Sequence, residues 1–162
     1  LNANLKGWVS QEAIEECFLQ LATLNQVAAE TLQAFNVHAA TDITGFGLAG
    51  HALEIAQGSE VTIEIETKKL PWLPEAAAMY ERGVTTGTNQ ANRKLVVDDV
   101  EFPAQQVIQE LLVDPQTSGG LLVSVPAEEA EAALSKLRKA GVPNACLVGQ
   151  VIPRGDKGIR FF

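Results

Sequence analysis

Apolar and polar residues follow each other along this chain in two periods, one typical of strands and one typical of helices. Strict alternation at residues 61–66, VTIEIE, predicts a strand. Shorter apolar runs at residues 37–43 and 121–125 predict two more strands. Over residues 10–35 apolar positions recur at helical spacing, and Ser10 is placed to cap the first turn. The chain is therefore expected to alternate between strands and helices.

The last third of the chain has the clearest element boundaries. Residues 126–139 predict a helix with acidic residues in its first turn and basic residues in its last, as the helix dipole favours. It lies between the strand at 121–125 and a strand at 145–152, an order that predicts a right-handed crossover between parallel strands. The predicted fold class is α/β or α+β, with helices that cover a mixed sheet. Further expectations are helices at 48–57, 75–82 and 103–113, an irregular tail at 1–9 and a long ordered loop at 84–103.

Composition and charge narrow the class of protein. The 162 residues are 46% hydrophobic, which suits one globular domain that buries its own core. The 12 basic and 20 acidic residues give a net charge of −8, so we expect no nucleic acid and no membrane surface as a partner. Cys17 and Cys146 form no CxxC pair, which is typical of a reduced cytoplasmic protein. No apolar run is long enough to span a bilayer, and Leu1 in place of a first Met favours a fragment.

The most informative segment is TDITGFGLAGH at residues 41–51. It contains Gly45, Gly47 and Gly50 in the GxGxxG spacing of dinucleotide-binding sites, in which a pyrophosphate lies at the N-terminus of the following helix. Glu66 lies about 20 residues further on, where such sites bind a ribose. One hypothesis is therefore a dinucleotide-binding module. The structural alternative is that the glycines only allow close packing.

Asp42 favours a different chemistry. It precedes the first glycine by three positions, where its carboxylate would repel a pyrophosphate. Mg²⁺ between the two groups turns this repulsion into attraction, because Mg²⁺ binds carboxylates together with phosphate oxygens. Thr41 and Thr44 add hydroxyls that could orient Asp42 or bind phosphate. The local chemistry thus favours a metal and a triphosphate over a dinucleotide, with simple helix capping by Asp42 and Thr44 as the structural alternative.

Two other polar segments are candidate sites. DPQTSGG at residues 114–120 offers the amides and hydroxyls of Thr117 and Ser118 to an anion, although the same residues are ordinary in a turn. TTGTNQAN at residues 85–92 is interpreted as a solvated loop. There is no P-loop, and no Lys or Arg lies within the glycine motif, so the chain offers about half of an active site. The remaining reactive residue types lack a partner pattern and are interpreted as structural: His38, His51, Cys17 and Cys146.

Three motifs resemble those of one family. ATDITGFGLAGH at residues 40–51 is similar to the ATD-[IV]-TGFGLxGH signature of the selenophosphate synthetases (selenide, water dikinases), and DPQTSGGLL at 114–122 is similar to their second C-terminal signature. GTNQAN at 87–92 resembles, with departures, a loop between the two. Order and spacing agree over nearly the whole chain. The wider superfamily includes aminoimidazole ribonucleotide synthetase, formylglycinamidine synthetase, thiamine-monophosphate kinase and a hydrogenase maturation factor.

The resemblance implies an enzyme that makes selenophosphate, AMP and phosphate from selenide, ATP and water, with Mg²⁺, as a cytoplasmic homodimer. It implies two α/β domains, of which residues 23–162 are the C-terminal one, preceded by a linker and leading helix at 1–22. The expected fold is a three-layer α/β/α sandwich with a mixed sheet and partly ferredoxin-like topology. Asp42 is then the metal ligand. The expected nucleotide-binding residues are Thr41, Thr44, Gly45, Gly47, Thr117 and Ser118.

The N-terminal domain of that family, with its reactive Cys or Sec, has no counterpart in this chain. The resemblance therefore assigns no catalytic residue here, and we expect the chain to be inactive without that domain. Three alternatives stay open: a dinucleotide-binding module, a sister ATP-dependent synthetase of the same superfamily, and an interaction domain without catalysis.

Overall fold

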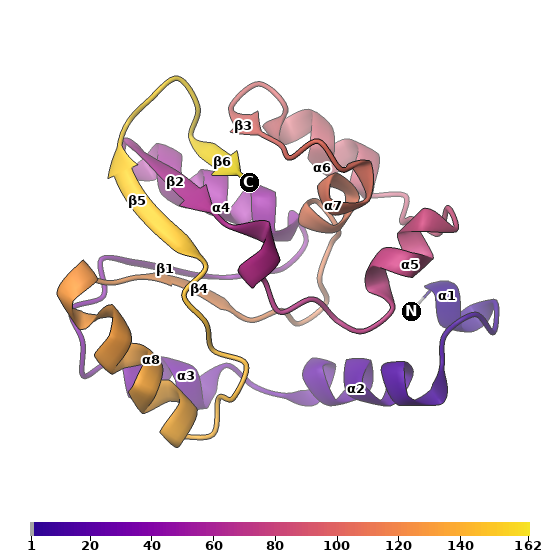
Figure 1. The fold of residues 1–162 in the computed structure, drawn as a ribbon, viewed down its shortest axis with the longest axis horizontal. Coiled ribbons are helices and arrows are strands. Elements are labelled where there is room, and N and C mark those ends of the chain that lie inside the picture. The colour runs from indigo at the N-terminus through magenta and orange to yellow at the C-terminus, as the bar shows by residue number, and fades with distance from the viewer. Residues whose placement is uncertain (1) are drawn as a thin grey trace.

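The computed structural model describes residues 2–162, and Figure 1 follows the chain from indigo to yellow. The α-helices are α1 (Asn2–Leu5), α2 (Gln11–Ala22), α3 (Gln26–Leu32), α4 (Gly47–Gly58), α5 (Ala76–Glu81), α6 (Asn89–Val96), α7 (Gln106–Leu112) and α8 (Ala130–Lys139). The strands are β1 (Ala39–Asp42), β2 (Val61–Ile65), β3 (Val100–Glu101), β4 (Leu121–Ser124), β5 (Gly149–Pro153) and β6 (Ile159–Phe161). Short 3-10 helices are η1 (Thr67–Lys69) and η2 (Ala127–Glu129).

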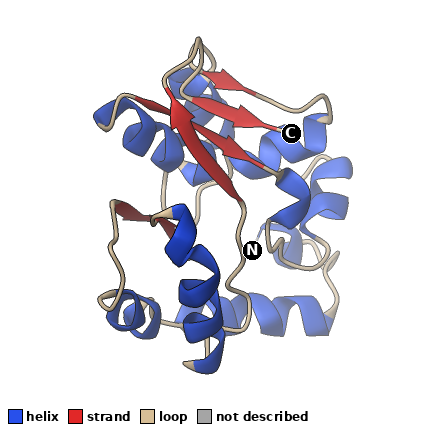
Figure 2. Ribbon diagram, turned by 60° about the vertical axis from the view of Figure 1, so that its left-hand side comes forward, coloured by secondary structure: helices blue, strands red, loops and turns tan. Residues whose placement is uncertain are grey.

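The strands form two separate sheets. A four-stranded mixed sheet has the order β3-β6-β2-β5, in which β6 is parallel to both β3 and β2, and β5 is antiparallel to β2. β1 and β4 form an antiparallel pair of their own. Figure 2 shows this pair apart from the larger sheet. The expected α/β (α+β) class with helices and a mixed sheet is confirmed.

The expected crossover between parallel strands is wrong. β4 pairs with β1 and β5 pairs with β2, so α8 connects two different sheets, and both of these pairings are antiparallel. The cause lies in residues 140–148, whose turns and irregular backbone carry the chain from the end of α8 to the larger sheet. Cys146 lies in this segment rather than in a strand, and its thiol is half-buried.

α4 is the central helix of the fold. It packs against β1, β2 and β6 and also against α6 and α7. Ala49, Ala52 and Ala56 on this helix are fully buried, and such small side chains let the neighbouring elements approach closely. Ile65 and Ile159 of the larger sheet belong to the same core and are also fully buried. A helix held on most of its sides fixes the position of its own N-terminus, where the glycine motif lies.

The single helix expected at residues 10–35 is two helices. Ser10 caps α2 as expected, because its hydroxyl accepts the Ala13 amide at 3.2 Å. The helix ends at Ala22, because the backbone of the next residue, Thr23, is extended. Asn25 then donates its side-chain amide to the Gly119 carbonyl at 2.9 Å, a tertiary contact that the local pattern cannot reveal. No helix within residues 2–162 combines the length and apolar character needed to cross a membrane.

Regular structure also replaces two segments that were expected to be irregular. Residues 84–103 contain α6 and β3 instead of one long loop. Two asparagines on α6 are buried. Because asparagine has a low helix propensity, the sequence did not predict this helix. Residues 1–9 contain α1, whose Ala3 packs against Met79 and Val84. α7 begins at Gln106, later than the expected start at Pro103.

Candidate functional site

Two loops that are far apart in the sequence lie side by side at one end of the β1–β4 pair. We call residues 43–47 the glycine-rich loop and residues 114–120 the second loop. The first follows β1 and the second precedes β4, and the register of the two strands brings them together. Three backbone hydrogen bonds join them: Ile43 N to Gly120 O at 2.9 Å, Gly119 N to Ile43 O at 3.1 Å and Gln116 N to Thr44 O at 3.0 Å. The two sequence motifs therefore form one structural unit.

Two of the glycines are required by close backbone contact. Gly47 has φ +70°, and a Cβ there would lie 2.8 Å from the Val113 carbonyl carbon. A Cβ on Gly119 would lie 2.2 Å from the Ile43 carbonyl oxygen. Gly45 differs, because no atom lies within 4 Å of a Cβ built on it and its φ is not in the left-handed region. Packing therefore explains Gly47 and Gly119 but leaves Gly45 free for another use.

Both loops carry backbone amides without an internal partner. Within residues 2–162, the amides of Thr44, Gly45 and Phe46 donate to no backbone or side-chain acceptor. The same holds for the amides of Thr117 and Ser118 in the second loop. Phe46 is the residue before the first turn of α4 and offers no side-chain cap. Unpaired amides at the start of a helix are the usual donors to a bound anion.

Asp42 lies at the end of β1 with its side chain exposed. Within residues 2–162 its carboxylate makes no hydrogen bond and no ion pair, and no three His, Cys, Asp or Glu side chains gather into a metal site. The Thr41 hydroxyl donates to the backbone carbonyl of Asp42 at 3.1 Å rather than to the carboxylate. Asp42 is thus one free carboxylate, and a metal bound there needs its other ligands from phosphate, water or another part of the protein.

The Thr44 hydroxyl already has a hydrogen-bond partner on α4. It lies 3.1 Å from Nε2 of His51, and Nδ1 of His51 lies 3.0 Å from Oε2 of Glu54. Because the carboxylate of Glu54 accepts the proton on Nδ1, a neutral imidazole presents Nε2 as an acceptor, and Thr44 donates to it. With the ring neutral, this hydrogen bond occupies the hydroxyl proton of Thr44. The expectation that Thr44 contributes to phosphate binding stays a prediction. The structural role expected for His51 agrees with its burial and its two partners.

The third motif contributes two buried side chains that sequence reasoning missed. Asn92 on α6 donates one amide hydrogen to the Gly45 carbonyl at 2.8 Å and the other to the Val113 carbonyl at 2.9 Å. Asn89, one turn earlier, donates to Glu110 and bonds with Tyr80. The signal available in the sequence was the i, i+3 spacing of the two asparagines, which puts both on one helix face.

Asp114, the first residue of the second loop, faces inward. Its carboxylate accepts hydrogen bonds from the Tyr80 hydroxyl and from Nε2 of Gln116. Burial raises the pKa of Asp114, and these two hydrogen bonds oppose the rise only in part. Burial and the neighbouring carboxylate also raise the pKa of Tyr80. Asp114 therefore anchors the second loop to α5 and is not placed as a metal ligand.

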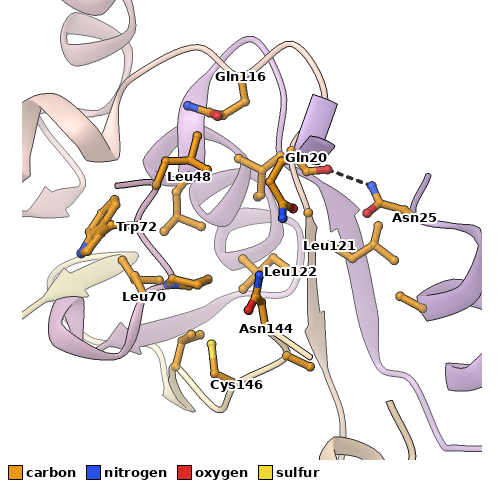
Figure 3. A pocket seen from close by; sticks show the side chains of 18 of the residues that line it. Gln20, Asn25, Leu48, Leu70, Trp72, Gln116, Leu121, Leu122, Asn144 and Cys146 are labelled. Carbon is orange, nitrogen blue, oxygen red and sulfur yellow. Dashed lines mark hydrogen bonds between the residues drawn. The ribbon is translucent and has the colours of Figure 1, made fainter. Parts of the chain in front are cut away.

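A large open concavity of about 1920 Å³ lies beside the second loop. Thr117 and Ser118 line it, whereas Thr41, Asp42, Thr44, Gly45 and Gly47 do not. Figure 3 shows Leu48, Leu70, Trp72 and Leu122 around it, together with Gln116 of the second loop. Apolar side chains of this kind suit a packed protein surface better than a polyphosphate. The two loops are thus joined through their backbones, and of the predicted nucleotide-binding residues Thr117 and Ser118 alone line this concavity.

Comparison with known proteins identifies a matching family, relatives with similar sequences and solved structures with a similar fold. Residues 4–161 match the family described as AIR synthase related protein, C-terminal domain. The chain is 41% identical over 161 residues to selenide, water dikinase 2 of Peptoclostridium acidaminophilum, and 41% identical over 162 residues to selenide, water dikinase of Clostridioides difficile strain 630. These matches cover 98% of this chain in both cases, but 46% and 47% of the relatives. The chain therefore spans about half the length of the curated relatives it matches.

Solved structures with a similar fold include two of the hydrogenase maturation protein HypE. The crystal structure of E. coli HypE has a TM-score of 0.57 and 22% sequence identity, and the match covers 88% of this chain and 36% of that one. HypE in complex with ATP has a TM-score of 0.51 and 24% identity, over 83% of this chain and 33% of that one. At these identities the likeness establishes a shared fold.

Proposed function

The chain belongs to the family of AIR synthase related proteins, as their C-terminal domain, and from this premise we propose that it is the C-terminal half of a selenide, water dikinase. The observation that carries the proposal is the pairing of the two loops beside the free carboxylate of Asp42. The identity of 41% with curated selenide, water dikinases favours this activity over the sister synthetases of the superfamily. The reaction of the complete enzyme is then the conversion of selenide, ATP and water to selenophosphate, AMP and phosphate.

Asp42 is the residue proposed to hold Mg²⁺. Its exposure and its lack of any internal partner within residues 2–162 leave both carboxylate oxygens free to bind a metal. When bound there, Mg²⁺ neutralises charge on the phosphates of ATP. The chain itself supplies one carboxylate. This agrees with the usual coordination of Mg²⁺, in which one or two carboxylates bind the ion and phosphate oxygens and water complete its ligands.

The glycine-rich loop is proposed to bind the phosphates through its backbone. The unpaired amides of Thr44, Gly45 and Phe46 lie at the start of α4, where the helix dipole favours a negative charge. Open space at Gly45 allows a phosphate to approach the backbone closely. The amides of Thr117 and Ser118 in the second loop are a further set of donors. In this arrangement backbone groups of the two loops bind, while the hydroxyl of Thr44 does not donate.

The rest of the site is proposed to come from outside this chain. The two loops contain no Lys or Arg, no nucleophile and no second carboxylate free to bind a metal. A lysine, further aspartates and the reactive Cys or Sec are expected in an N-terminal domain. We further propose that the complete enzyme is a cytoplasmic homodimer. The division of this chain at residues 22 and 23 stays a prediction.

The dinucleotide-binding alternative does not fit the topology. Its fingerprint requires two parallel strands of one sheet on either side of the helix. β1 and β2, which flank α4, lie in different sheets. Glu66, the expected ribose ligand, pairs with Lys69 instead. The glycine motif is therefore not part of a Rossmann unit.

Product analysis of the complete enzyme tests the proposed reaction. ATP and Mg²⁺ are supplied under anaerobic conditions with and without selenide, and ³¹P NMR follows the products. We expect a selenophosphate resonance, with AMP and phosphate in equal amounts, only when selenide is present. ATP that stays intact with selenide, but is consumed with another phosphoryl acceptor, would assign the chain to a sister synthetase instead.

A further inference from the structure

Asn92 connects the two loops that carry the proposed function. Its side chain has two amide hydrogens, and both are used: one on the Gly45 carbonyl at 2.8 Å and one on the Val113 carbonyl at 2.9 Å. The first carbonyl belongs to the glycine-rich loop, and the second belongs to the residue that precedes the second loop. Asn92 is 2% exposed, so water cannot replace these hydrogen bonds without opening the core.

The hydrogen bond to Gly45 also orients a neighbouring amide. The carbonyl of Gly45 and the N–H of Phe46 belong to the same peptide group, and the described chain contains no cis peptide. In a trans peptide the C=O and N–H point in opposite directions. Since the carbonyl is fixed toward Asn92 on α6, the N–H of Phe46 is fixed away from α6. This amide is one of the unpaired donors at the start of α4.

We propose that Asn92 is a positioning residue, which holds the Gly45–Phe46 peptide so that the Phe46 N–H faces the nucleotide phosphates and which fixes the spacing of the two loops. The proposal rests on the proposed function for its ligand, but the geometry that carries it is independent of the reaction. Asn92 touches neither substrate nor metal in this account. It acts through the backbone of the glycine-rich loop.

A role of this kind predicts a particular kinetic effect. The Phe46 amide contacts the phosphates in the bound substrate and in the transition state alike. Loss of its orientation therefore removes uniform binding, which raises KM for ATP and leaves kcat nearly unchanged. We expect Asn92→Leu to raise KM for ATP by about tenfold, which corresponds to about 1.4 kcal/mol of binding, and to change kcat by less than about threefold.

The test compares Asn92→Leu with Thr62→Val in the full-length protein. Thr62, on β2 of the larger sheet, is a matched control because it is also buried and polar. Its hydroxyl donates to the Lys157 carbonyl and accepts the Gly155 amide, both in the connection between β5 and β6. Kinetics are measured with ATP, and hydrogen exchange by mass spectrometry is measured on peptides that cover residues 43–50 and 113–120. We expect faster exchange confined to these peptides in Asn92→Leu and unchanged exchange there in Thr62→Val.

Two outcomes are decisive. Faster exchange spread evenly over the protein in Asn92→Leu would overturn the proposal, because it would give Asn92 a general role in stability. An unchanged KM in a folded Asn92→Leu enzyme would overturn it as well. If Asn92→Leu does not fold, Asn92→Ser, which keeps one donor and removes volume, replaces it with an intermediate increase in KM expected. Hydrogen exchange needs no nucleotide, so a protein without ATP turnover would contradict the proposed function and still test the positioning role.

Discussion

Asp42, the last residue of β1, lies directly opposite Leu121, the first residue of β4. This register explains why two motifs separated by about 70 residues of sequence form one structural unit. The glycine-rich loop leaves β1 at the same edge at which the second loop enters β4, and hydrogen bonds between Ile43, Gly119 and Gly120 continue the pairing beyond the strands. A shift of the register by one residue would move every side chain of β1 to the opposite face of the pair. The observed pairing therefore determines the face on which the side chain of Asp42 lies.

The close contact at Gly47 predicts a loss of stability in Gly47→Ala. A Cβ there meets the backbone of Leu112 and Val113, which cannot move without shifting α7, and the positive φ adds strain. We expect the free energy of unfolding to fall by about 2–3 kcal/mol, measured by urea denaturation. Gly58→Ala is the control, since open space surrounds Gly58 and its φ is not in the left-handed region. Equal stability of the two variants would show that the close approach of α4 and α7 is not required.

The buried carboxyl of Asp114 predicts a pH-dependent effect of Asp114→Asn. The pKa of Asp114 is raised by burial, so its contribution to stability is greatest at low pH and is lost as pH rises through the folded-state pKa. Because asparagine does not ionise, the Asp114→Asn variant does not lose stability through deprotonation at this position as pH rises. Urea denaturation at about pH 4 and about pH 7 should therefore show the variant gaining stability relative to the unmodified protein as pH rises.

Asp99→Asn provides a control of opposite sign. The hydrogen bond from Arg154 lowers the pKa of Asp99, so this residue contributes stability above its unfolded-state pKa, and the contribution is lost as pH falls. The Asp99 variant should lose stability relative to the unmodified protein at neutral pH and less so in acid. The same direction of change in both variants would contradict the assignment of Asp114 as a buried carboxyl with a raised pKa.

The chain of hydrogen bonds from Thr44 through His51 to Glu54 predicts unequal effects along it. His51→Leu leaves the half-buried Thr44 hydroxyl without its acceptor, and we expect a loss of about 1–2 kcal/mol in the free energy of unfolding. Glu54 is 60% exposed, and a glutamine in its place still presents an oxygen to Nδ1. Glu54→Gln should therefore cost less than about 0.5 kcal/mol. Chemical denaturation of both variants checks the order, and a larger loss in Glu54→Gln would contradict it.

Periodicity located most of the elements but not their partners. Strict alternation at residues 61–66 marks β2, and the Ser10 cap marks the start of α2, because these signals depend only on neighbouring residues. The division into two sheets depends on the path of residues 140–148, which have no period. The sequence order of strand, helix and strand therefore predicted a crossover that the structure does not contain.

The candidate site was predicted in part for similar reasons. The motifs identified Asp42 and the glycine-rich loop, because a carboxylate before glycines has a local chemical meaning. Asn92 escaped notice, since its role depends on carbonyls that are 47 and 21 positions away in the sequence. The hydrogen bond between the Thr44 hydroxyl and His51 was not expected from the sequence, because the orientation of both side chains is visible only in the fold.

The central claim is that Asp42 holds a metal against the phosphates of ATP, and the most direct test is Asp42→Asn in the complete enzyme. Selenophosphate formation is followed by ³¹P NMR with ATP, Mg²⁺ and selenide, while thermal unfolding reports on the fold. Because the side chain is exposed and unpaired within residues 2–162, we expect an unchanged melting temperature and a turnover lower by about a hundredfold or more. A folded variant with nearly normal turnover would contradict the account.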